Sequence, residues 1–191
     1  MVLTTAYFPP AEYFSILAKY SAVYLDSAEN YQKQSYRNRC YILTANGPEA
    51  LTFPIVHDGA RLITEVKVDY STPWLRRTEY ALDSAYYNSP FFEYYRDELF
   101  SILDSRPETL WDLNYRIMEF LCRKIGVPVP SVTAPGAVSG LERAVIHPKV
   151  KSEYVGREYW QVFREKFGFV GNLSVADLLF NEGPESLCYL K

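Results

Sequence analysis

The first 70 residues consist of short apolar runs separated by polar residues that favour turns. This pattern predicts strands over residues 2–7, 22–25, 36–44, 51–56 and 62–68, with one amphipathic helix over residues 11–20. Asn46-Gly47 and Asp58-Gly59 follow the third and fourth of these strands, and such pairs are typical of β-hairpin turns. Apolar and polar side chains alternate over residues 62–68, which indicates a strand with one exposed face.

From residue 73 onward the apolar positions recur every three to four residues, which predicts helices. A first long helix is expected from about Trp74. Ser89-Pro90 is a capping residue followed by proline, a combination that is expected to open a second helix. The stretch from Ser105 to Glu108 has the spacing of a capping box, and the helix that it opens is expected to end at Gly126.

Residues 127–156 are rich in proline and glycine and are expected to form a long loop, which in a compact domain is usually functional or mobile. Two helices are expected after it, one with Trp160, Phe163 and Phe167 facing inward and one opened by Ser174. The whole chain, residues 1–191, is therefore predicted to be a single α/β or α+β domain. A mixed sheet from the strand-rich residues 1–70 would pack with a helical C-terminal half, made of residues 73–126 and 157–191.

The composition excludes several classes of protein. Hydrophobic residues make up 48% of the chain and charged residues 23%, as in ordinary globular proteins. A net charge of −3 argues against a general nucleic-acid-binding protein, which needs an excess of basic surface. No apolar run is long enough to span a membrane, and the N-terminus lacks the features of a signal peptide. The protein is accordingly expected in the cytoplasm, and the sequence gives no indication of its oligomeric state.

Metal and cofactor sites are not expected either. The three cysteines, Cys40, Cys122 and Cys188, include no CxxC pair, and the chain has only two histidines, so neither a structural zinc site nor a disulfide framework is predicted. The sequence has no dinucleotide fingerprint, phosphate-binding Walker loop, nucleophile elbow or zinc-protease motif.

The stretch YQKQSYRNRCYI, residues 31–42, concentrates cations within this acidic chain. If residues 36–44 are extended, Arg37 and Arg39 lie on one face, roughly 6.6–7 Å apart. Two such guanidinium groups suit phosphate or carboxylate, and Lys33 would add a charge from the preceding loop. Arg76 and Arg77 would contribute if the fold brings them near. The alternative is that the two strand arginines pair with Glu65 and Asp69 on a neighbouring strand.

Two further residues are candidates. Pro9-Pro10 would hold Tyr7 rigidly at a strand end, where α/β folds bind ligands, although a plain strand-to-helix turn is the alternative. His147 lies in the long loop near Lys149 and is a candidate general base, because histidine titrates near neutrality. The 17 tyrosines suit either half-buried faces or a cleft that stacks on sugars or bases.

The chain also resembles a known family. The resemblance rests on five segments: AYFPPAEYF, YQKQSYRNRCYI, LTFPIV, the PW–AY–SPFF series from Pro73 to Phe92, and FGFVGNLSVADLLFNEGPES. These segments resemble the WbqC-like proteins, bacterial proteins associated with gene clusters for O-antigen and other surface polysaccharides. Many members have Gln-Pro where this chain has Thr5-Ala6, and many have a histidine at the position of Thr78.

The resemblance implies a pathway, and it singles out Lys33, Arg37, Asn38 and Arg39. The first hypothesis is a group transferase of surface-polysaccharide biosynthesis that acts on a nucleotide-activated sugar or an acyl donor. The basic residues would hold phosphate, Asn38 would orient a polar group, Tyr7 would stack and His147 would act as base. The second hypothesis is a non-catalytic protein of the same pathway that binds a nucleotide sugar or serves as a scaffold.

Overall fold

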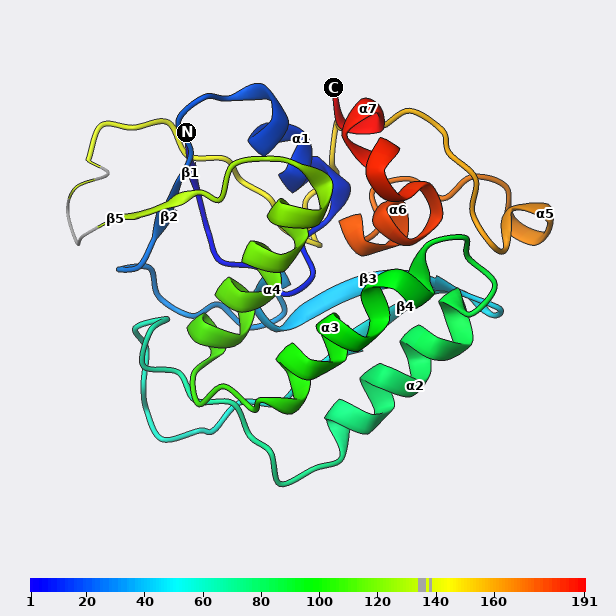
Figure 1. Cartoon of the computed structure of the whole chain (residues 1–191). Helices are drawn as coiled ribbons and strands as arrows, with labels where there is room; N and C mark the ends of the chain where they lie inside the picture. The colour runs from blue at the N-terminus through cyan, green and yellow to red at the C-terminus, as the bar shows by residue number, and fades with distance from the viewer. Residues whose placement is uncertain (134–136, 138) are drawn as a thin grey trace.

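The computed structural model describes residues 1–133, 137 and 139–191 (Figure 1). Its helices and strands confirm the α/β class. Strands of both directions occur, but in two separate sheets: a parallel sheet in the order β1-β2-β5 and an antiparallel hairpin of β3 and β4. Strand β5, Ser131–Thr133, lies inside the segment that was predicted to be a loop, so that prediction is wrong at these residues.

The parallel sheet gathers three short strands that are far apart in the sequence. Strand β1, Val2–Leu3, leads into helix α1, Ala11–Lys19, and then to strand β2, Tyr24–Asp26, which pairs with β1 on one side and β5 on the other. Residues 142–144 lie along the free side of β1, where the Val2 amide donates to the carbonyl of Glu142 (2.8 Å). Because the strands are parallel, the segments that follow β1 and β2 leave from the same edge.

The predicted first strand, residues 2–7, is shorter than expected because its later residues find other partners. The Thr5 amide donates to the Glu29 side chain (2.8 Å), and the Tyr7 amide donates to the carbonyl of Tyr36 (2.8 Å). Backbone groups that are satisfied in this way are not available to extend a strand ladder.

The hairpin consists of β3, Arg39–Thr44, and β4, Gly47–Thr52. Its register pairs Thr44 with Gly47 and Arg39 with Thr52, which confirms the predicted turn at Asn46-Gly47. Gly47 has φ +106°, a conformation that glycine adopts without steric cost. The fourth predicted strand was placed too late, because β4 already ends at Thr52.

Residues 62–68 do not form the predicted strand. In the described part of the chain they make only single bridges, such as Ile55 with Val68 and Lys67 with Thr109. Val66 and Val68 are nevertheless buried while Glu65 and Lys67 are exposed, so the alternation reports burial correctly but not strand pairing.

Three long helices follow: α2, Trp74–Tyr86, α3, Phe92–Asp104, and α4, Leu110–Ile125. Helix α4 ends at Gly126 as predicted, with φ +86°. The predicted capping box is wrong, because Thr109 caps α4 by accepting from the amide of Asp112 (3.1 Å). Ser105 instead ends α3, where its hydroxyl donates to the carbonyl of Ile102 (2.7 Å).

Ser89 likewise ends a helix instead of opening one. Its hydroxyl donates to the carbonyl of Tyr86 (2.7 Å), the last residue of α2, and α3 begins only at Phe92.

The C-terminal part contains helices α5, Arg164–Phe167, α6, Val175–Glu182, and α7, Ser186–Leu190. A 3₁₀ turn over Gly183–Glu185 joins the last two. Ser174 caps α6 as predicted, accepting from the amide of Ala176 (3.2 Å). The prediction of an inward-facing Trp160 is wrong, since its side chain is 47% exposed and the helix after it is only four residues long.

A buried carboxylate ties α6 to its surroundings. Asp177 accepts from the hydroxyls of Tyr86 (2.8 Å) and Tyr159 (2.6 Å) and from the amide of Gln161 (2.9 Å). Burial raises the pKa of Asp177, and these three donors oppose the rise. The network therefore joins α2, α6 and the segment before α5.

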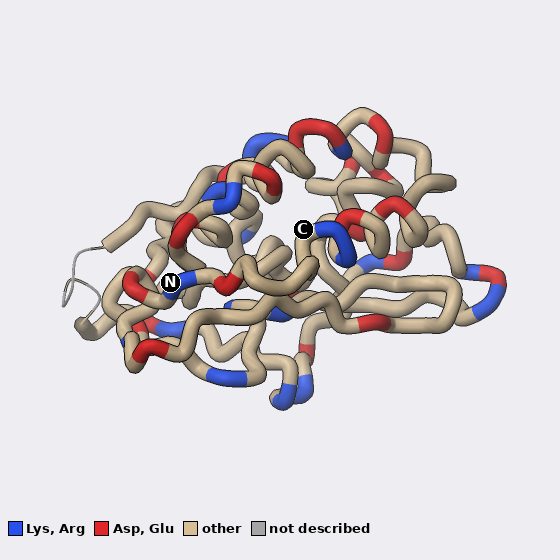
Figure 2. The backbone as a smooth tube through the Cα atoms, turned by 90° about the horizontal axis from the view of Figure 1, so that it is seen from below, with Lys and Arg blue, Asp and Glu red and all other residues tan. Residues whose placement is uncertain are grey.

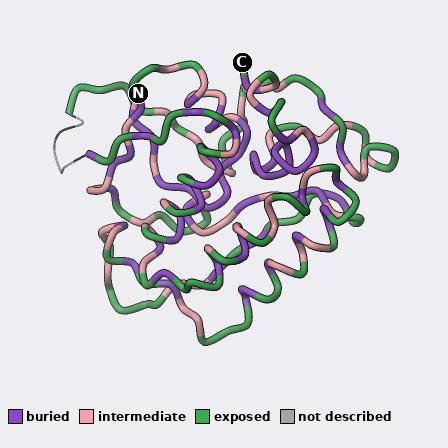
Figure 3. The backbone as a smooth tube through the Cα atoms, in the orientation of Figure 1, coloured by how far each residue is buried: buried purple, intermediate pink, exposed green. Residues whose placement is uncertain are grey.

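The hydrophobic core runs from Leu3 in β1 to Leu190 in α7 (Figure 3). Buried positions line one face of α1 and of α4, whereas α6 is buried on all sides from Val175 to Asn181. Helix α4 contacts α3, α6 and the 3₁₀ turn that precedes β3. Among the described residues, no helix has the length and apolar character needed to cross a membrane.

Candidate functional site

The basic segment is not a continuous strand. Residues Tyr36–Asn38 form a single 3₁₀ turn, η1, and β3 begins only at Arg39. Ser35 caps this turn, because its hydroxyl accepts from the Arg37 amide (3.3 Å) while donating to the carbonyl of Gln32 (2.6 Å). The prediction that Arg37 and Arg39 share one strand face is therefore wrong. The Arg37 side chain is buried and Arg39 is half-buried.

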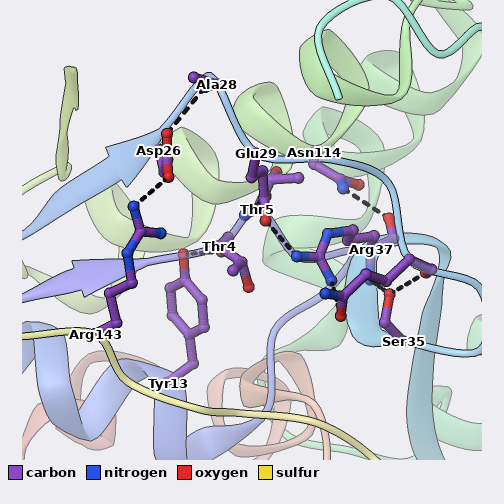
Figure 4. A network of polar contacts seen from close by, with 11 residues as sticks. Thr4, Thr5, Tyr13, Asp26, Ala28, Glu29, Ser35, Arg37, Asn114 and Arg143 are labelled. Carbon is purple, nitrogen blue, oxygen red and sulfur yellow. Dashed lines mark hydrogen bonds and ion pairs between the residues drawn. The ribbon is translucent and has the colours of Figure 1, made fainter. Parts of the chain in front are cut away.

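Arg37 forms an ion pair inside the protein (Figure 4). Its Nη2 donates to Glu29, whose other oxygen accepts from the Thr5 amide (2.8 Å). Asn114 of α4 holds the backbone of the turn by donating to the carbonyl of Arg37 (2.8 Å). Burial raises the pKa of Glu29 to about 7, and the Arg37 charge and the Thr5 amide oppose that rise.

The pairing partners that were considered from the sequence do not match this arrangement. Glu65 is exposed, and Asp69 accepts from the amide of Ser71 (2.8 Å). In the described residues, neither carboxylate forms an ion pair with Arg37 or Arg39.

A second ion pair lies at the same edge of the parallel sheet. Asp26, the last residue of β2, binds Arg143 at 2.7 Å (Figure 4). Arg143 lies in the segment beside β1, so this pair joins that segment to β2. Both ion pairs thus follow the carboxyl ends of parallel strands, where α/β proteins commonly bind ligands.

Arg37 lines a hollow of about 260 Å³, here called the Arg37 pocket. It brings together Arg37 and His147, which are 110 positions apart in the sequence. The Nδ1 atom of His147 accepts from the Lys149 amide (3.1 Å), so a neutral ring carries its proton on Nε2 and can donate there. The lining residues are Val2, Leu3, Thr4, Gln32, Arg37, Arg143, Ala144, Val145, Ile146, His147 and Val150.

Arg39 lines a different hollow of about 590 Å³, here called the Arg39 pocket. The Nε atom of Arg39 is buried and has no hydrogen-bond partner among the residues that the structure describes. Arg77 adds a second cation from α2. The lining residues are Tyr31, Gln34, Asn38, Arg39, Glu49, Ala50, Leu51, Thr52, Phe53, Pro54, Thr72, Trp74, Arg77, Thr78 and Ala81.

Aromatic rings form one wall of the Arg39 pocket. Phe53 and Trp74 lie 5.1 Å apart between ring centroids, inclined by 32°. Asn38 is fixed against this wall, since its Nδ2 donates to the carbonyl of Phe53 (2.8 Å). The pocket therefore combines apolar ring surface with two cations.

Tyr7 lies beneath this wall and not in the lining. It is fully buried and packs edge-on against Phe53, with ring centroids 4.8 Å apart. Its hydroxyl is buried without a hydrogen-bond partner in the described residues. Burial raises the pKa of Tyr7 well above its ordinary value, and nearby Thr78 opposes the rise. Lys33 is exposed and lines neither pocket.

Of the predicted site residues, Arg37 and His147 line one hollow and Asn38 and Arg39 line the other, whereas Tyr7 and Lys33 line neither. Sequence reasoning missed Glu29, Phe53 and Arg143. The sequence contains one indication of Glu29: it lies in the polar segment that directly follows strand β2, Tyr24–Asp26, at the end where ligands commonly bind. The pairing of Arg143 with Asp26 depends on a tertiary contact that no local pattern records.

Acidic and basic residues are interspersed along the chain, as Figure 2 shows. The charge that a ligand meets is therefore set locally, by the few side chains of each pocket, and not by the net charge of −3.

The model of the WbqC-like protein family matches residues 5–145 of this chain. The chain belongs to the WbqC-like protein family. The matched range contains every residue that lines the Arg39 pocket. Six residues that line the Arg37 pocket lie outside it: Val2, Leu3, Thr4, Ile146, His147 and Val150. The C-terminal segment FGFVGNLSVADLLFNEGPES also lies outside the matched range.

This WbqC-like chain is also similar to the uncharacterized protein Rv1507c of Mycobacterium tuberculosis (strain ATCC 25618 / H37Rv). The two are 25% identical over 223 residues, which covers 100% of this chain and 96% of the relative. No solved structure matches the chain significantly.

Proposed function

We propose that this WbqC-like protein binds an anionic, nucleotide-activated sugar or acyl donor in the Arg39 pocket and transfers the activated group. The observation that carries the proposal is the buried, unpartnered Nε of Arg39 beside a hollow that also holds Arg77. A buried donor without an acceptor is costly, and a phosphate oxygen would supply that acceptor.

Size and shape support the same class of ligand. The pocket volume of about 590 Å³ lies within the range of about 300–1,000 Å³ that small-molecule sites occupy. Phe53 and Trp74 are almost fully buried (1% and 3% exposed), so the half-buried ring of Tyr31 is the aromatic lining that a base or sugar could contact. Arg39 and Arg77 suit the phosphates. Asn38, held by the Phe53 carbonyl, would orient a polar group of the ligand.

In the proposed reaction, an acceptor hydroxyl or amine forms a bond to the transferred group. The bond between that group and its phosphate or thiol leaving group breaks, and the acceptor proton passes to a base or to solvent. The resemblance to proteins of surface-polysaccharide gene clusters suggests that the acceptor is a sugar, and we place the reaction in the cytoplasm.

Thermal unfolding in the presence of candidate donors tests the binding step. A ligand at a hundred times its dissociation constant stabilises the folded state by about 2.7 kcal/mol. Nucleotides, nucleotide sugars and acyl-coenzyme A thioesters are compared, and at least one class is expected to raise the melting temperature. If every class leaves melting unchanged, the proposal is wrong.

Two variants locate the bound donor. Arg39→Met and Arg77→Ala each remove a charge-assisted contact worth about 1.5–3 kcal/mol, so affinity should fall by about tenfold to a hundredfold. Arg76→Ala is the matched control, because Arg76 is an exposed neighbour on α2 that does not line this pocket. Equal losses in Arg76→Ala and Arg77→Ala would indicate a non-specific effect of charge.

The specific observation that favours a binding or scaffold protein is the geometry of His147. Its Nδ1 already accepts from Lys149 and it lies in the other pocket, so it is not set up as a base beside a donor in the Arg39 pocket. Mass spectrometry of the bound donor incubated with sugar acceptors separates the two functions. Binding without turnover would identify a binding protein.

A further inference from the structure

We infer that the Arg37 pocket is a second ligand site, which binds a carboxylate that bears a short hydrocarbon group. This inference goes beyond the donor site proposed above and does not depend on it. It rests on the cluster of donors at one end of the hollow, the apolar walls around the rest of it, and the charges already present there.

Besides Arg143, which is paired with Asp26, four side chains of the lining supply hydrogen-bond donors. Arg37 is buried, and its Nε has no partner among the described residues. The Nε2 of His147 is a donor, because Nδ1 accepts from the backbone. Gln32 accepts from Arg37 through Oε1 (3.4 Å), which leaves its amide group to donate, and the Thr4 hydroxyl completes the set. A ligand that only accepts hydrogen bonds, such as a carboxylate, matches these donors.

The walls are apolar. Val145 is 75% exposed and Val150 is 53% exposed, so hydrocarbon faces water at the rim of the hollow. A small inorganic anion would leave this surface wet, whereas a short alkyl group would cover it and gain the free energy of burial. The other apolar lining residues are Val2, Leu3, Ala144 and Ile146.

The local charges favour one negative charge over two. Arg37 is paired with Glu29, and Arg143 is paired with Asp26, so both cations have carboxylate neighbours. Because the charges of each pair largely cancel, a phosphate dianion gains little net attraction here, while it loses more hydration than a carboxylate monoanion does. The Arg39 pocket is different, because Arg39 and Arg77 line it with Glu49 as the single lining carboxylate.

Calorimetric titration of the full chain with isobutyrate, acetate, isobutyramide and inorganic phosphate tests the inference at constant ionic strength. Isobutyrate is expected to bind most tightly, acetate more weakly because it lacks the alkyl branch, and the uncharged amide and phosphate not measurably. Absence of isobutyrate binding, or equal binding of phosphate, overturns the inference.

Variants at exposed residues test where the carboxylate binds and leave the buried Arg37–Glu29 ion pair unchanged. Val145→Asp adds a negative charge at the rim, and the dissociation constant for isobutyrate should rise by about tenfold or more. Val155→Asp is the matched control, because Val155 is 93% exposed and does not line this pocket. Its affinity should match that of the wild type, and an equal loss in both variants contradicts the assignment.

His147→Ala should also weaken isobutyrate binding, since it removes the Nε2 donor. Arg77→Ala, which lies in the other pocket, should leave isobutyrate binding unchanged. If Arg77→Ala abolishes it, the carboxylate occupies the Arg39 pocket and the inference is wrong. The two proposals can therefore be tested independently. Arg77→Ala tests nucleotide binding in the Arg39 pocket, whereas Val145→Asp and His147→Ala test carboxylate binding in the Arg37 pocket.

Discussion

The two arginines of the sequence RNR have different environments, although only one residue separates them. Arg37 is buried against Glu29, whereas Arg39 lines an open hollow with its Nε unpartnered. The cause is a single 3₁₀ turn over Tyr36–Asn38, which rotates one side chain away from the face that an extended strand would give it. Charge and spacing singled out these two residues but did not predict their geometry, since the turn depends on the Ser35 hydroxyl and on Asn114 of a distant helix.

Glu29 makes stability depend on pH. Its pKa in the folded protein is about 7, against an ordinary value of 4.5. Between these values the folded state keeps a proton that the unfolded state has released, so the free energy of unfolding falls as pH rises from 4.5 to about 7. Below pH 4.5 the stabilisation by the retained proton is fully present, and above about pH 7 it is lost.

Glu29→Gln should remove this contribution, because glutamine does not titrate. Each unit of pKa difference corresponds to about 1.4 kcal/mol, so the change in slope is measurable by urea unfolding at several pH values. Glu65→Gln, which removes one exposed carboxylate, should keep the wild-type slope. An unchanged slope in Glu29→Gln would show that the buried carboxylate does not titrate as described.

At the level of elements, helix periodicity was the most informative pattern. Helix α4 was predicted together with its end at Gly126, because sixteen residues with a strong 3–4 repeat leave little ambiguity. The strands were predicted less well. Strand β5 is three residues long, follows Pro130 and is defined by pairing with β2, which is a tertiary contact without a local pattern.

The start of α4 offers a direct comparison between the predicted cap and the observed one. Thr109→Ala should destabilise the protein by about 1 kcal/mol, because the Asp112 amide loses its acceptor. Ser105→Ala should change stability by less than about 0.5 kcal/mol, since Ser105 is exposed. Chemical unfolding of both variants measures the difference in stability. A larger loss in Ser105→Ala would support the predicted capping box over the observed Thr109 cap.

At the level of the whole molecule, the polar segment 31–39 separates two hollows. This arrangement could not be predicted from the sequence, because one hollow depends on α2 and the hairpin while the other depends on residues 142–150 lying beside β1. The family match covers residues 5–145 and assigns no reaction to either hollow.

Thiol reactivity tests the packing of the molecule as a whole. Cys40 and Cys122 are buried and Cys188 is exposed. Burial raises the pKa of the Cys122 thiol to about 12 and also raises that of Cys40, so neither thiol is reactive in the folded state. A disulfide reagent should label one thiol in the native protein and all three after unfolding.

Cys188→Ser is the control for this experiment and should show no rapid labelling. Rapid labelling of two or three thiols in the native protein would show that α4 or the β3–β4 hairpin is less tightly packed than described.

The separation of Arg37 from Arg39 also has an evolutionary consequence. Since each guanidinium lines a different hollow, a single nucleotide change at one codon alters the lining of that hollow and keeps the other arginine in place. Related chains can therefore change one hollow at a time, which would not be possible if both arginines lined the same hollow.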